Sequence, residues 1–508
     1  MARGARRATF GTFGVTRRGR ARSVVVGAGL GGLAAAIRLR ARGDDVVLVE
    51  ALDQPGGRAR TFRRDGYTFD AGPTVITAPY LLDELFALAG RDRRDYVSLV
   101  PVDPFYRILF HDGATFDYHG DEERLLAEIE RLSPRDVDGY RRLARVAERI
   151  FDVGYTRLAD QPFDRLSTML RVVPDMVRLR SHRSVYALVA EHVRDERLRQ
   201  ALTFEPLLVG GHPFRASSIY LLIHWLERKW GVHFALGGTG AIVSALARLL
   251  EEMGGELRLS APVERILVGR GGAVEGVRLA CGETLRADRV VCNADPTTVY
   301  AQLVDARHRR VHADRRVARV RQSMGLFVGY FGVDRAYPAL AHHTIVLGPR
   351  YRGLLDDIFV RRRLADDFSL YLHAPTRTDP SLAPPGHDAM YVLSPVPNLK
   401  ADVDWTREGA AYFDRVLDAL ERRVLPGLGG ALTTRFHMTP LDFARDLRSA
   451  DGAAFGPEPL LTQSAWFRYH NRSPDVDGLY FVGAGTHPGA GVPGVLSSAK
   501  VLERILDR

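Results

Sequence analysis

The chain has 508 residues, too many for one simple hydrophobic core, so two or three lobes are expected, which can interleave in sequence. A hydrophobic content of 46% and a charged content of 26% are those of an ordinary globular protein. The formal net charge is +10, but residues 1–22 contain seven arginines and no acidic residue, so the remainder carries only +3. Basic patches interleaved with aromatic residues do not occur elsewhere, which argues against nucleic acid as a partner.

Residues 1–22 are expected to form a basic, disordered tail or an over-extended start of the chain. Arg17-Arg18 before an apolar stretch could imitate a twin-arginine export signal, but cleavage there would destroy the strand and glycine loop that follow. The two cysteines, Cys281 and Cys292, make no disulfide framework and fit a reducing cytoplasm. No run of 18 or more apolar residues is found, so the sequence predicts no segment that spans a bilayer.

The first predicted elements are a strand over residues 23–26, a glycine-rich loop, a helix over 33–42 and a second strand over 46–49 that leads to Glu50. This is the G-x-G-x-x-G pattern of a dinucleotide site. Its first glycine makes the tight turn, its second lets the backbone approach a pyrophosphate, and its third lets helix and strand pack closely. Glu50 is expected to bind the adenosine ribose hydroxyls. The loop residues assigned to the cofactor are Gly27, Ala28, Gly29, Gly31 and Gly32.

A second glycine turn directly after Glu50 separates the possible cofactors. It carries Gly57 and Arg58, and Gly72-Pro73-Thr74 follow shortly afterwards. A turn with an arginine at this place indicates FAD rather than a nicotinamide dinucleotide. Arg58 suits a phosphate or the ribityl chain because its guanidinium donates hydrogen bonds in pairs, although Arg58 taken alone could equally be a surface residue.

The sequence near the C-terminus, GAGTHPGAGVPG over residues 483–494, holds five glycines between a predicted strand and a predicted helix. Glycines let a main chain lie against a flat ring, and a helix N-terminus stabilises the negative charge of a reduced flavin. An ordinary strand–turn–helix connection would need fewer glycines. The residues assigned to the flavin in this loop are Gly483, Gly485, Gly491 and Val492.

Several blocks of the chain follow one known pattern, among them VVVGAGLGGLAAAIRLRARG, PGGRA, FDAGPTVIT, LTQSAWFR and VGAGTHPGAGVPGV. They resemble the bacterial phytoene desaturase family, which comprises FAD-dependent carotenoid desaturases related to amine oxidases. The matching blocks run from about residue 23 to the end, whereas residues 1–22 have no counterpart in the pattern.

The resemblance implies an α/β fold with a discontinuous Rossmann-like FAD-binding domain, built from residues 23–95, 236–300 and 440–508. An inserted α+β substrate-binding domain is expected over 301–439 and a helical, membrane-associating lobe over 96–235. The backbone of Val263 is expected to meet the adenine, although the sequence alone shows only a strand valine. The apolar stretch 217–226 is either a core helix or a membrane-contacting helix.

The family implies the insertion of conjugated double bonds into phytoene, to neurosporene or lycopene, by hydride transfer to the flavin within an apolar tunnel. The expected partners are a long-chain isoprenoid substrate, a membrane surface, and quinone or oxygen as electron acceptor. The protein is expected in the cytoplasm, on the inner face of the cell membrane. No metal site is expected.

No side chain is firmly assigned as an acid or base. His487 is the candidate, with a structural capping role equally open. Some relatives carry an acidic residue where Thr168 stands here, which puts an acid at that position in doubt, although Asp164 lies nearby. Three further histidines could equally belong to a sheet or to loops: His342, His343 and His373.

Alternative functions differ from this one in the sequence features that they require. A desaturase of a later carotenoid, such as hydroxy- or methoxyneurosporene, or a carotenoid isomerase would look alike, because the product depends on tunnel depth. Amine and protoporphyrinogen oxidases share the nucleotide fold but are not expected to carry THPGAGVPG. A non-enzymatic protein that binds prenyl lipids, like the Rab GDP-dissociation inhibitors, would not need the intact glycine loop, Glu50 and Arg58.

Overall fold

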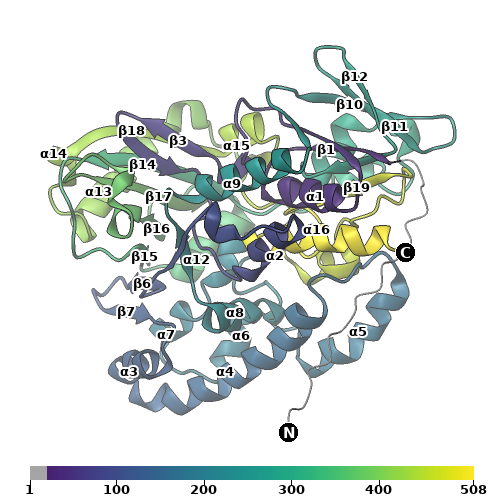
Figure 1. Ribbon diagram of the computed structural model, residues 1–508. Coiled ribbons are helices and arrows are strands. Elements are labelled where there is room, and N and C mark those ends of the chain that lie inside the picture. The colour runs from purple at the N-terminus through teal and green to yellow at the C-terminus, as the bar shows by residue number, and fades with distance from the viewer. Residues whose placement is uncertain (1–19) are drawn as a thin grey trace, which may run out of the picture.

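The computed structural model describes residues 20–508, so the expectation for the basic tail falls almost entirely outside the described residues. A five-stranded parallel sheet brings together segments that lie far apart in the sequence (Figure 1). Its strands, in spatial order, are β19 (Leu479–Phe481), β13 (Arg289–Cys292), β1 (Arg22–Val26), β2 (Asp45–Val49) and β9 (Glu256–Arg258). The central strand β1 is buried from Ser23 to Val26 because helices or strands cover both faces of such a sheet.

Helix α1 (Leu30–Ala41) is buried along most of its length, since it packs against α16 (Val492–Leu506) and α9 (Thr239–Glu252). In Figure 1 the purple α1 and the yellow α16, from opposite ends of the chain, lie side by side. Apolar residues lie on all sides of this helix, as expected in such a core, and the buried Arg38 pairs with Glu84 and Glu503. The helix begins three residues earlier than the sequence predicts, so Gly31 and Gly32 lie in its first turn.

A seven-stranded sheet forms the second main layer, at the left of Figure 1. Alternate residues of its strand β14 face opposite sides: Phe327 and Phe331 pack against helix α13 (Trp405–Arg423), whereas Leu326 and Val328 face a cavity. The strands, in order, are β18 (Leu432–Met438), β14 (Gly325–Val333), β17 (Asp388–Val396), β16 (Leu370–His373), β15 (His343–Val346), β6 (Tyr106–Leu109) and β7 (Thr115–Tyr118).

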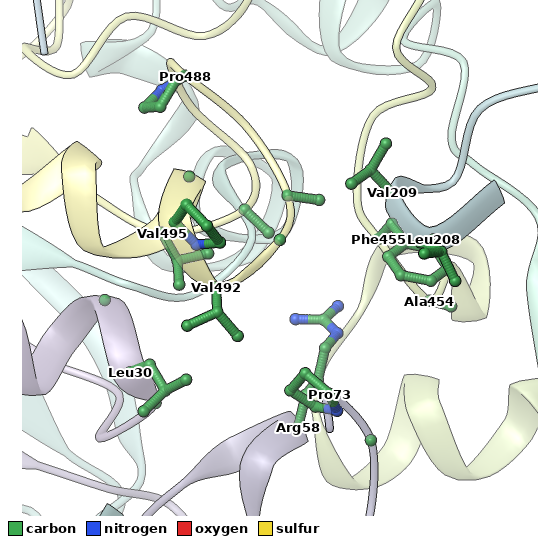
Figure 2. A pocket seen from close by; sticks show the side chains of 18 of the residues that line it. Leu30, Arg58, Pro73, Leu208, Val209, Ala454, Phe455, Pro488, Val492 and Val495 are labelled. Atoms are coloured by element: carbon green, nitrogen blue, oxygen red, sulfur yellow. The ribbon is translucent and has the colours of Figure 1, made fainter. Parts of the chain in front are cut away.

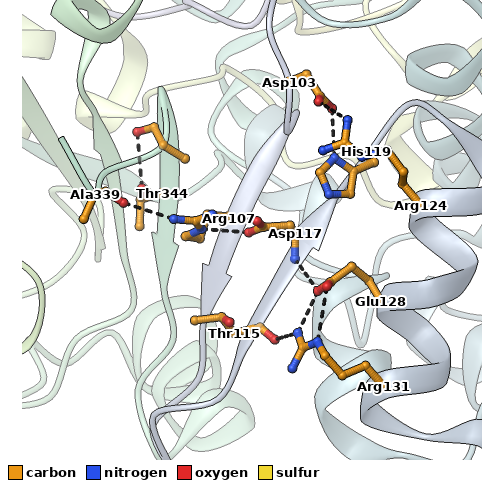
Figure 3. Close-up of polar contacts among 11 residues, drawn as sticks. Asp103, Arg107, Thr115, Asp117, His119, Arg124, Glu128, Arg131, Ala339 and Thr344 are labelled. Carbon is orange, nitrogen blue, oxygen red and sulfur yellow. Dashed lines mark hydrogen bonds and ion pairs between the residues drawn. The ribbon is translucent and has the colours of Figure 1, made fainter.

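The last two of these strands come from the interval 96–235, which is otherwise mostly helical. β6 pairs in parallel with β15, and Arg107 on β6 donates to the carbonyl of Ala339 (3.0 Å) and to Asp117 on β7 (Figure 3). Arg131 from the neighbouring helix donates to the carbonyl of Thr115 (2.6 Å). These bonds fasten the helical region to the edge of the sheet.

The helical region lies below both sheets in Figure 1. The stretch 217–226 forms a 3-10 turn and the start of α8, which packs against α4, and none of its side chains is exposed. Of the two interpretations of this stretch, the structure therefore supports the core helix. The helices of the region are α3 (Glu122–Leu132), α4 (Val137–Phe151), α5 (Leu166–Arg178), α6 (Val185–Ala190), α7 (Glu196–Ala201) and α8 (Leu222–Trp230).

Smaller elements complete the chain. Within residues 20–508, no helix combines the length and the hydropathy needed to cross a bilayer. The remaining strands are β3 (Thr61–Arg64), β4 (Tyr67–Asp70), β5 (Leu99–Pro101), β8 (His233–Ala235), β10 (Val263–Val268), β11 (Val274–Leu279) and β12 (Thr284–Arg286). The remaining α-helices are α2 (Tyr80–Leu88), α10 (Pro296–Thr298), α11 (Asp314–Val317), α12 (Tyr351–Asp356), α14 (Leu428–Ala431) and α15 (Pro440–Asp446).

Candidate functional site

A cavity of about 570 Å³ is lined by residues of both main sheets and of the helical region. Figure 2 shows Leu30, Val492 and Val495 on one side of it, and Val209 and Phe455 on the other. One part of the wall is backbone from the glycine-rich loops, and the other part is apolar side chains. The cavity is thus the place where the predicted cofactor residues and the predicted substrate tunnel would meet.

Asn293, which directly follows β13, packs against the glycine loop after β1. A Cβ on Gly29 would lie 2.8 Å from Asn293 Nδ2, and a Cβ on Gly31 would lie 2.6 Å from Asn293 Oδ1. Gly27 has a φ of +97°, and a Cβ on Gly32 would collide with its carbonyl oxygen. No side chain of residues 20–508 caps the N-terminus of α1 at Gly29, so its N–H groups are available to an anionic group such as a phosphate.

Glu50 holds this loop from the end of β2. Its carboxylate is buried and accepts the N–H of Ala28 at Oε2 (2.7 Å) and the N–H of Leu52 at Oε1 (3.1 Å). Val263, at the start of β10, is buried, and both residues line the cavity. The position of Glu50 suits the predicted contact with ribose hydroxyls, which stays a prediction.

Arg58 lines the cavity from a turn beside the glycine loop; the turn begins at Gly56, which has a φ of +113° and donates its N–H to the carbonyl of Ala28 (2.8 Å). Arg58 Nη2 donates to Ser449 Oγ (2.7 Å), and burial lowers the pKa of the Arg58 guanidinium. Burial raises the pKa of Asp295, whose charge acts on Arg58. Arg58 Nε and Asp295 Oδ2 have no hydrogen-bond partner among the described residues, and both residues line the cavity through other atoms.

The C-terminal glycine loop follows β19 and leads into α16. Gly491 has a φ of +96° and begins α16 without a side-chain cap, so this second helix N-terminus also faces the cavity with free N–H groups. Arg468 fixes the loop by donating hydrogen bonds to the carbonyls of Ala484 (2.6 Å) and Thr486 (3.0 Å). The loop is therefore a fixed wall of the site.

The structure brings most of the predicted cofactor residues to the cavity wall. Four do not line it: Ala28 donates to Glu50, Gly32 packs on Gly27, and Gly483 and Gly485 would meet Asn293 and Pro296 if they carried a Cβ. The residues that line it are Gly27, Gly29, Gly31, Glu50, Gly57, Arg58, Gly72, Pro73, Thr74, Val263, Gly491 and Val492.

Asn293 and Asp295 follow strand β13 directly, at a strand-to-loop junction that the sequence places near the cofactor without assigning either residue to it. Parallel strands end at one edge of their sheet, and the residues after β13 therefore lie beside the loop after β1. The signal in the sequence was the polar pair in Asn293-Ala294-Asp295 at the end of a buried strand.

His487 lines the cavity, but its side chain makes a hydrogen bond and a ring contact within the protein. Its Nε2 donates to the carbonyl of Leu158 (3.0 Å), and its ring meets Phe163 edge-on with 4.7 Å between centroids. Burial lowers the pKa of His487 to about 4, so the ring is neutral at pH 7. These contacts suit a residue that positions the loop, and a catalytic role stays a prediction.

The segment around Thr168 offers no acid to the cavity. Thr168 lies on α5, and Asp164 pairs with Arg508 at 3.0 Å; neither side chain lines the cavity. Instead, α5 contributes Met169, Val172 and Met176 to its wall.

A buried polar cluster that the sequence analysis missed lies beside the apolar part of the cavity. Tyr106 donates to Glu227 Oε1 (2.6 Å), and His224 Nδ1 lies 3.3 Å from Glu205 Oε1. Both carboxyl groups are almost fully buried, and burial raises the pKa of each. Residues 205 and 227 belong to separate segments, so only the fold reveals their proximity.

The three histidines that the sequence left open lie together. One ring nitrogen from each of His342, His343 and His373 lies within 4.8 Å of the others, and all three rings are buried. The register of β15 and β16 pairs His343 with His373, which explains why residues so distant in the sequence converge.

FAD fits these residues. Two helix N-termini that no side chain of residues 20–508 caps, glycines that a Cβ would exclude, and the side chain of Arg58 line one end of the cavity. Helix N-termini suit the pyrophosphate and the flavin ring, and the planar guanidinium of Arg58 suits an oxygen-rich group.

Comparisons with known proteins agree with this fit. The profile of the family described as flavin containing amine oxidoreductase matches residues 30–501. The chain belongs to this family and is an FAD-dependent oxidoreductase. A solved oxidoreductase from Methanosarcina mazei shares the fold, with a TM-score of 0.65, 18% identity, and coverage of 96% of this chain and 100% of that chain.

Two relatives are more informative about the branch of the family. The chain is 52% identical over 488 residues to the lycopene-forming phytoene desaturase of Pseudescherichia vulneris, which covers 96% of this chain and 99% of the relative. It is 47% identical over 493 residues to the neurosporene-forming phytoene desaturase of Rhodobacter capsulatus, with 96% and 94% covered. These relatives confirm the resemblance to the bacterial phytoene desaturases.

Proposed function

We propose that the protein is a phytoene desaturase that inserts conjugated double bonds, to neurosporene or lycopene, by FAD-dependent dehydrogenation. The observation that carries this proposal is one continuous cavity. Backbone of the glycine-rich loops lines one part of it, and apolar side chains line the other part. The names of the two relatives support phytoene as the substrate. A later carotenoid, isomerisation and non-enzymatic lipid binding are each less well supported by those relatives.

The apolar part of the cavity suits a long hydrocarbon. Burial of apolar surface gives roughly 25 cal/mol per Å², so a polyene can be held without any charged contact. Bound FAD would accept a hydride from a C–H bond beside the polyene. The side chains that line this part include Met169, Val172, Leu208, Ile223, Leu226, Leu326, Val328 and Ile345.

The outer face of α5 supports a membrane surface as partner. Leu166, Leu170, Val173 and Val177 follow helical spacing and are 54%, 62%, 40% and 67% exposed. The inner face of the same helix lines the cavity, and Figure 1 shows α5 at the periphery of the molecule. A helix that is apolar on both faces suits a lobe that rests on lipid and admits a lipid-dissolved substrate.

Charged and aromatic neighbours strengthen this interpretation. Arg165, Arg171 and Arg178 are exposed on or beside the helix and would face anionic headgroups. Phe467, on a turn that contacts α5, is 55% exposed. We therefore place the protein on the inner face of the cell membrane, where quinone, or else oxygen, would take the electrons.

Expression of the chain in cells that make phytoene tests the function. Yellow or red cells, with absorption spectra of neurosporene or lycopene, are expected, and the spectrum reports the number of double bonds inserted. Colourless cells that accumulate phytoene, although the flavin-loaded protein is present, would reject phytoene as the substrate.

A further inference from the structure

A run of hydrogen bonds leaves the cavity wall through the seven-stranded sheet. The Tyr391 hydroxyl donates to the carbonyl of Gly72 (2.9 Å) and lies 2.7 Å from Thr74 Oγ1. Thr74 Oγ1 lies 3.1 Å from the hydroxyl of Tyr371. Thr74, Tyr371 and Tyr391 line the cavity, and Thr74 follows directly on the predicted cofactor residues Gly72 and Pro73. The run therefore begins where the cofactor and substrate would meet.

The same run continues through the three histidines toward the surface. The Tyr371 hydroxyl lies 2.7 Å from His343 Nδ1, and His373 Nε2 lies 3.0 Å from His342 Nε2. His342 Nδ1 lies 2.6 Å from Thr378 Oγ1, and Thr378 is partly exposed. Every member can both donate and accept a hydrogen bond, which is what transfer of a proton along such a run requires.

One link is open, between His343 and His373. Their ring centroids lie 5.3 Å apart, and within residues 20–508 the buried His343 Nε2 and His373 Nδ1 have no hydrogen-bond partner. Buried polar atoms are rarely left so, and one water between these rings would satisfy both. Such a water would make the run continuous from Thr74 to Thr378.

We propose that Thr74, Tyr391, Tyr371, His343, His373 and His342 form a proton relay from the cavity to the surface at Thr378, completed by one water between His343 and His373. This inference rests on the proposed function. Desaturation breaks two C–H bonds and forms one C=C bond; one hydrogen leaves with its electron pair as hydride, which FAD accepts, and the other leaves as a proton. A bound hydrocarbon has no group that can take that proton, whereas Tyr371, on the cavity wall, can accept it while passing its own to His343 Nδ1.

The electrostatics of the three rings suit a relay better than a metal site. Burial lowers the pKa of each histidine, and no carboxylate among the described residues acts on them, so all three rest neutral. A divalent cation would bury two positive charges without a counter-charge, which is costly. A neutral ring can hold an excess proton only briefly, as a relay requires.

Flash photoreduction of the bound flavin, without carotenoid, tests the relay, because reduction of flavin draws a proton from solution. Flavin absorbance follows the electron and a pH indicator dye follows the proton. In the wild-type protein both changes are expected together. In Tyr371→Phe, which keeps the ring and removes the hydroxyl, proton uptake is expected to lag by roughly a hundredfold or more, with flavin content unchanged.

Tyr330→Phe is the matched control, because Tyr330 is also a buried tyrosine of the same sheet, and its hydroxyl donates to the carbonyl of Ala71 (2.9 Å) rather than bonding to a histidine. In this variant, proton uptake is expected to occur at the same rate as flavin reduction. Prompt uptake in Tyr371→Phe, or the same lag in both variants, would overturn the relay. So would elemental analysis that finds a stoichiometric transition metal on the purified holoenzyme, lost in His343→Asn. No carotenoid is used, so failure of the relay and failure of the proposed substrate are read separately.

Discussion

The carboxamide of Asn293 fills the space that a side chain on Gly31 would need, with Oδ1 2.6 Å from the position of a Cβ there. The same position lies 3.0 Å from the Cα of Gly483, in the C-terminal loop. Three segments that are far apart in the sequence thus meet at one glycine in the first turn of α1. The glycine-rich loops from the N-terminal and C-terminal parts of the chain therefore pack against each other.

Gly31→Ala is expected to abolish stable FAD binding and to destabilise the protein by about 1–3 kcal/mol, the usual cost of overpacking. Alanine otherwise favours a helix over glycine, so the loss can be ascribed to the clash. Gly271→Ala is the control, because a Cβ there meets no atom within 4 Å. Flavin-to-protein absorbance and the melting temperature measure both effects. Equal flavin content in the two variants would contradict the close approach of the two loops.

Glu50→Gln should weaken FAD retention by about 1–3 kcal/mol, a factor of roughly 5 to 150 in Kd, because it removes the charge that holds two backbone N–H groups and the predicted ribose contact. Glu264→Gln is the control, since Glu264 is exposed on β10 and pairs only with Arg278. Release of FAD during dialysis measures the effect. Unchanged retention in Glu50→Gln would show that the ribose contact is misassigned.

The exposed face of α5 should govern binding to lipid. Leu170→Ser with Val177→Ser is expected to lower the affinity for anionic vesicles at least tenfold, since burial of one such side chain in lipid gives about 1.5–3 kcal/mol. Val360→Ser, at a position that is 55% exposed elsewhere on the molecule, should change nothing. Sedimentation with vesicles measures the bound fraction. Equal binding by all three proteins would remove α5 from the membrane surface.

Asp70 should make stability fall as the pH rises. Burial raises the pKa of Asp70 to about 7, although its Oδ1 accepts the N–H of Thr239 (2.7 Å) at the start of α9. The ordinary pKa of aspartate is about 3.9, so between about pH 4 and 7 the folded state keeps a proton that the unfolded state has released. The free energy of unfolding should therefore fall by up to about 1.4 kcal/mol per pH unit across this window.

Asp70→Asn cannot ionise and should lack this contribution. Its melting temperature, compared with that of the wild-type protein at pH 5, 6, 7 and 8, should fall less steeply, and the curves should run parallel above about pH 7. Parallel curves over the whole range would mean that Asp70 is ionised throughout.

The local pattern of the sequence was enough to predict the first strand, loop, helix and strand, because strand and helix periods and the glycine spacing all agree there. The start of α1 was predicted three residues too late, since glycines weaken a helix pattern; here they are needed for close packing against Gly27 and Asn293. The unpartnered atoms of Arg58 and Asp295 depend on strand order, which no short stretch of sequence reveals.

The exposed apolar face of α5 also could not be predicted from a local stretch of sequence. The stretch 217–226 attracted attention as the longest apolar helix-like run, but its side chains are covered because α8 packs against α4. α5 has a mixed sequence with three arginines on or beside it, and its exposed apolar face is evident only when its packing is known. The convergence of His343 and His373 likewise follows from the register of β15 and β16.

Anaerobic mixing of the FAD-loaded protein with phytoene in vesicles tests the central claim most directly. If the protein is an FAD-dependent phytoene desaturase, the absorbance of oxidised flavin is expected to be lost in a single turnover. Chromatography of the extracted carotenoid is expected to show one new double bond per flavin reduced. An oxidised flavin and intact phytoene, in a preparation whose flavin accepts electrons on photoreduction, would contradict it.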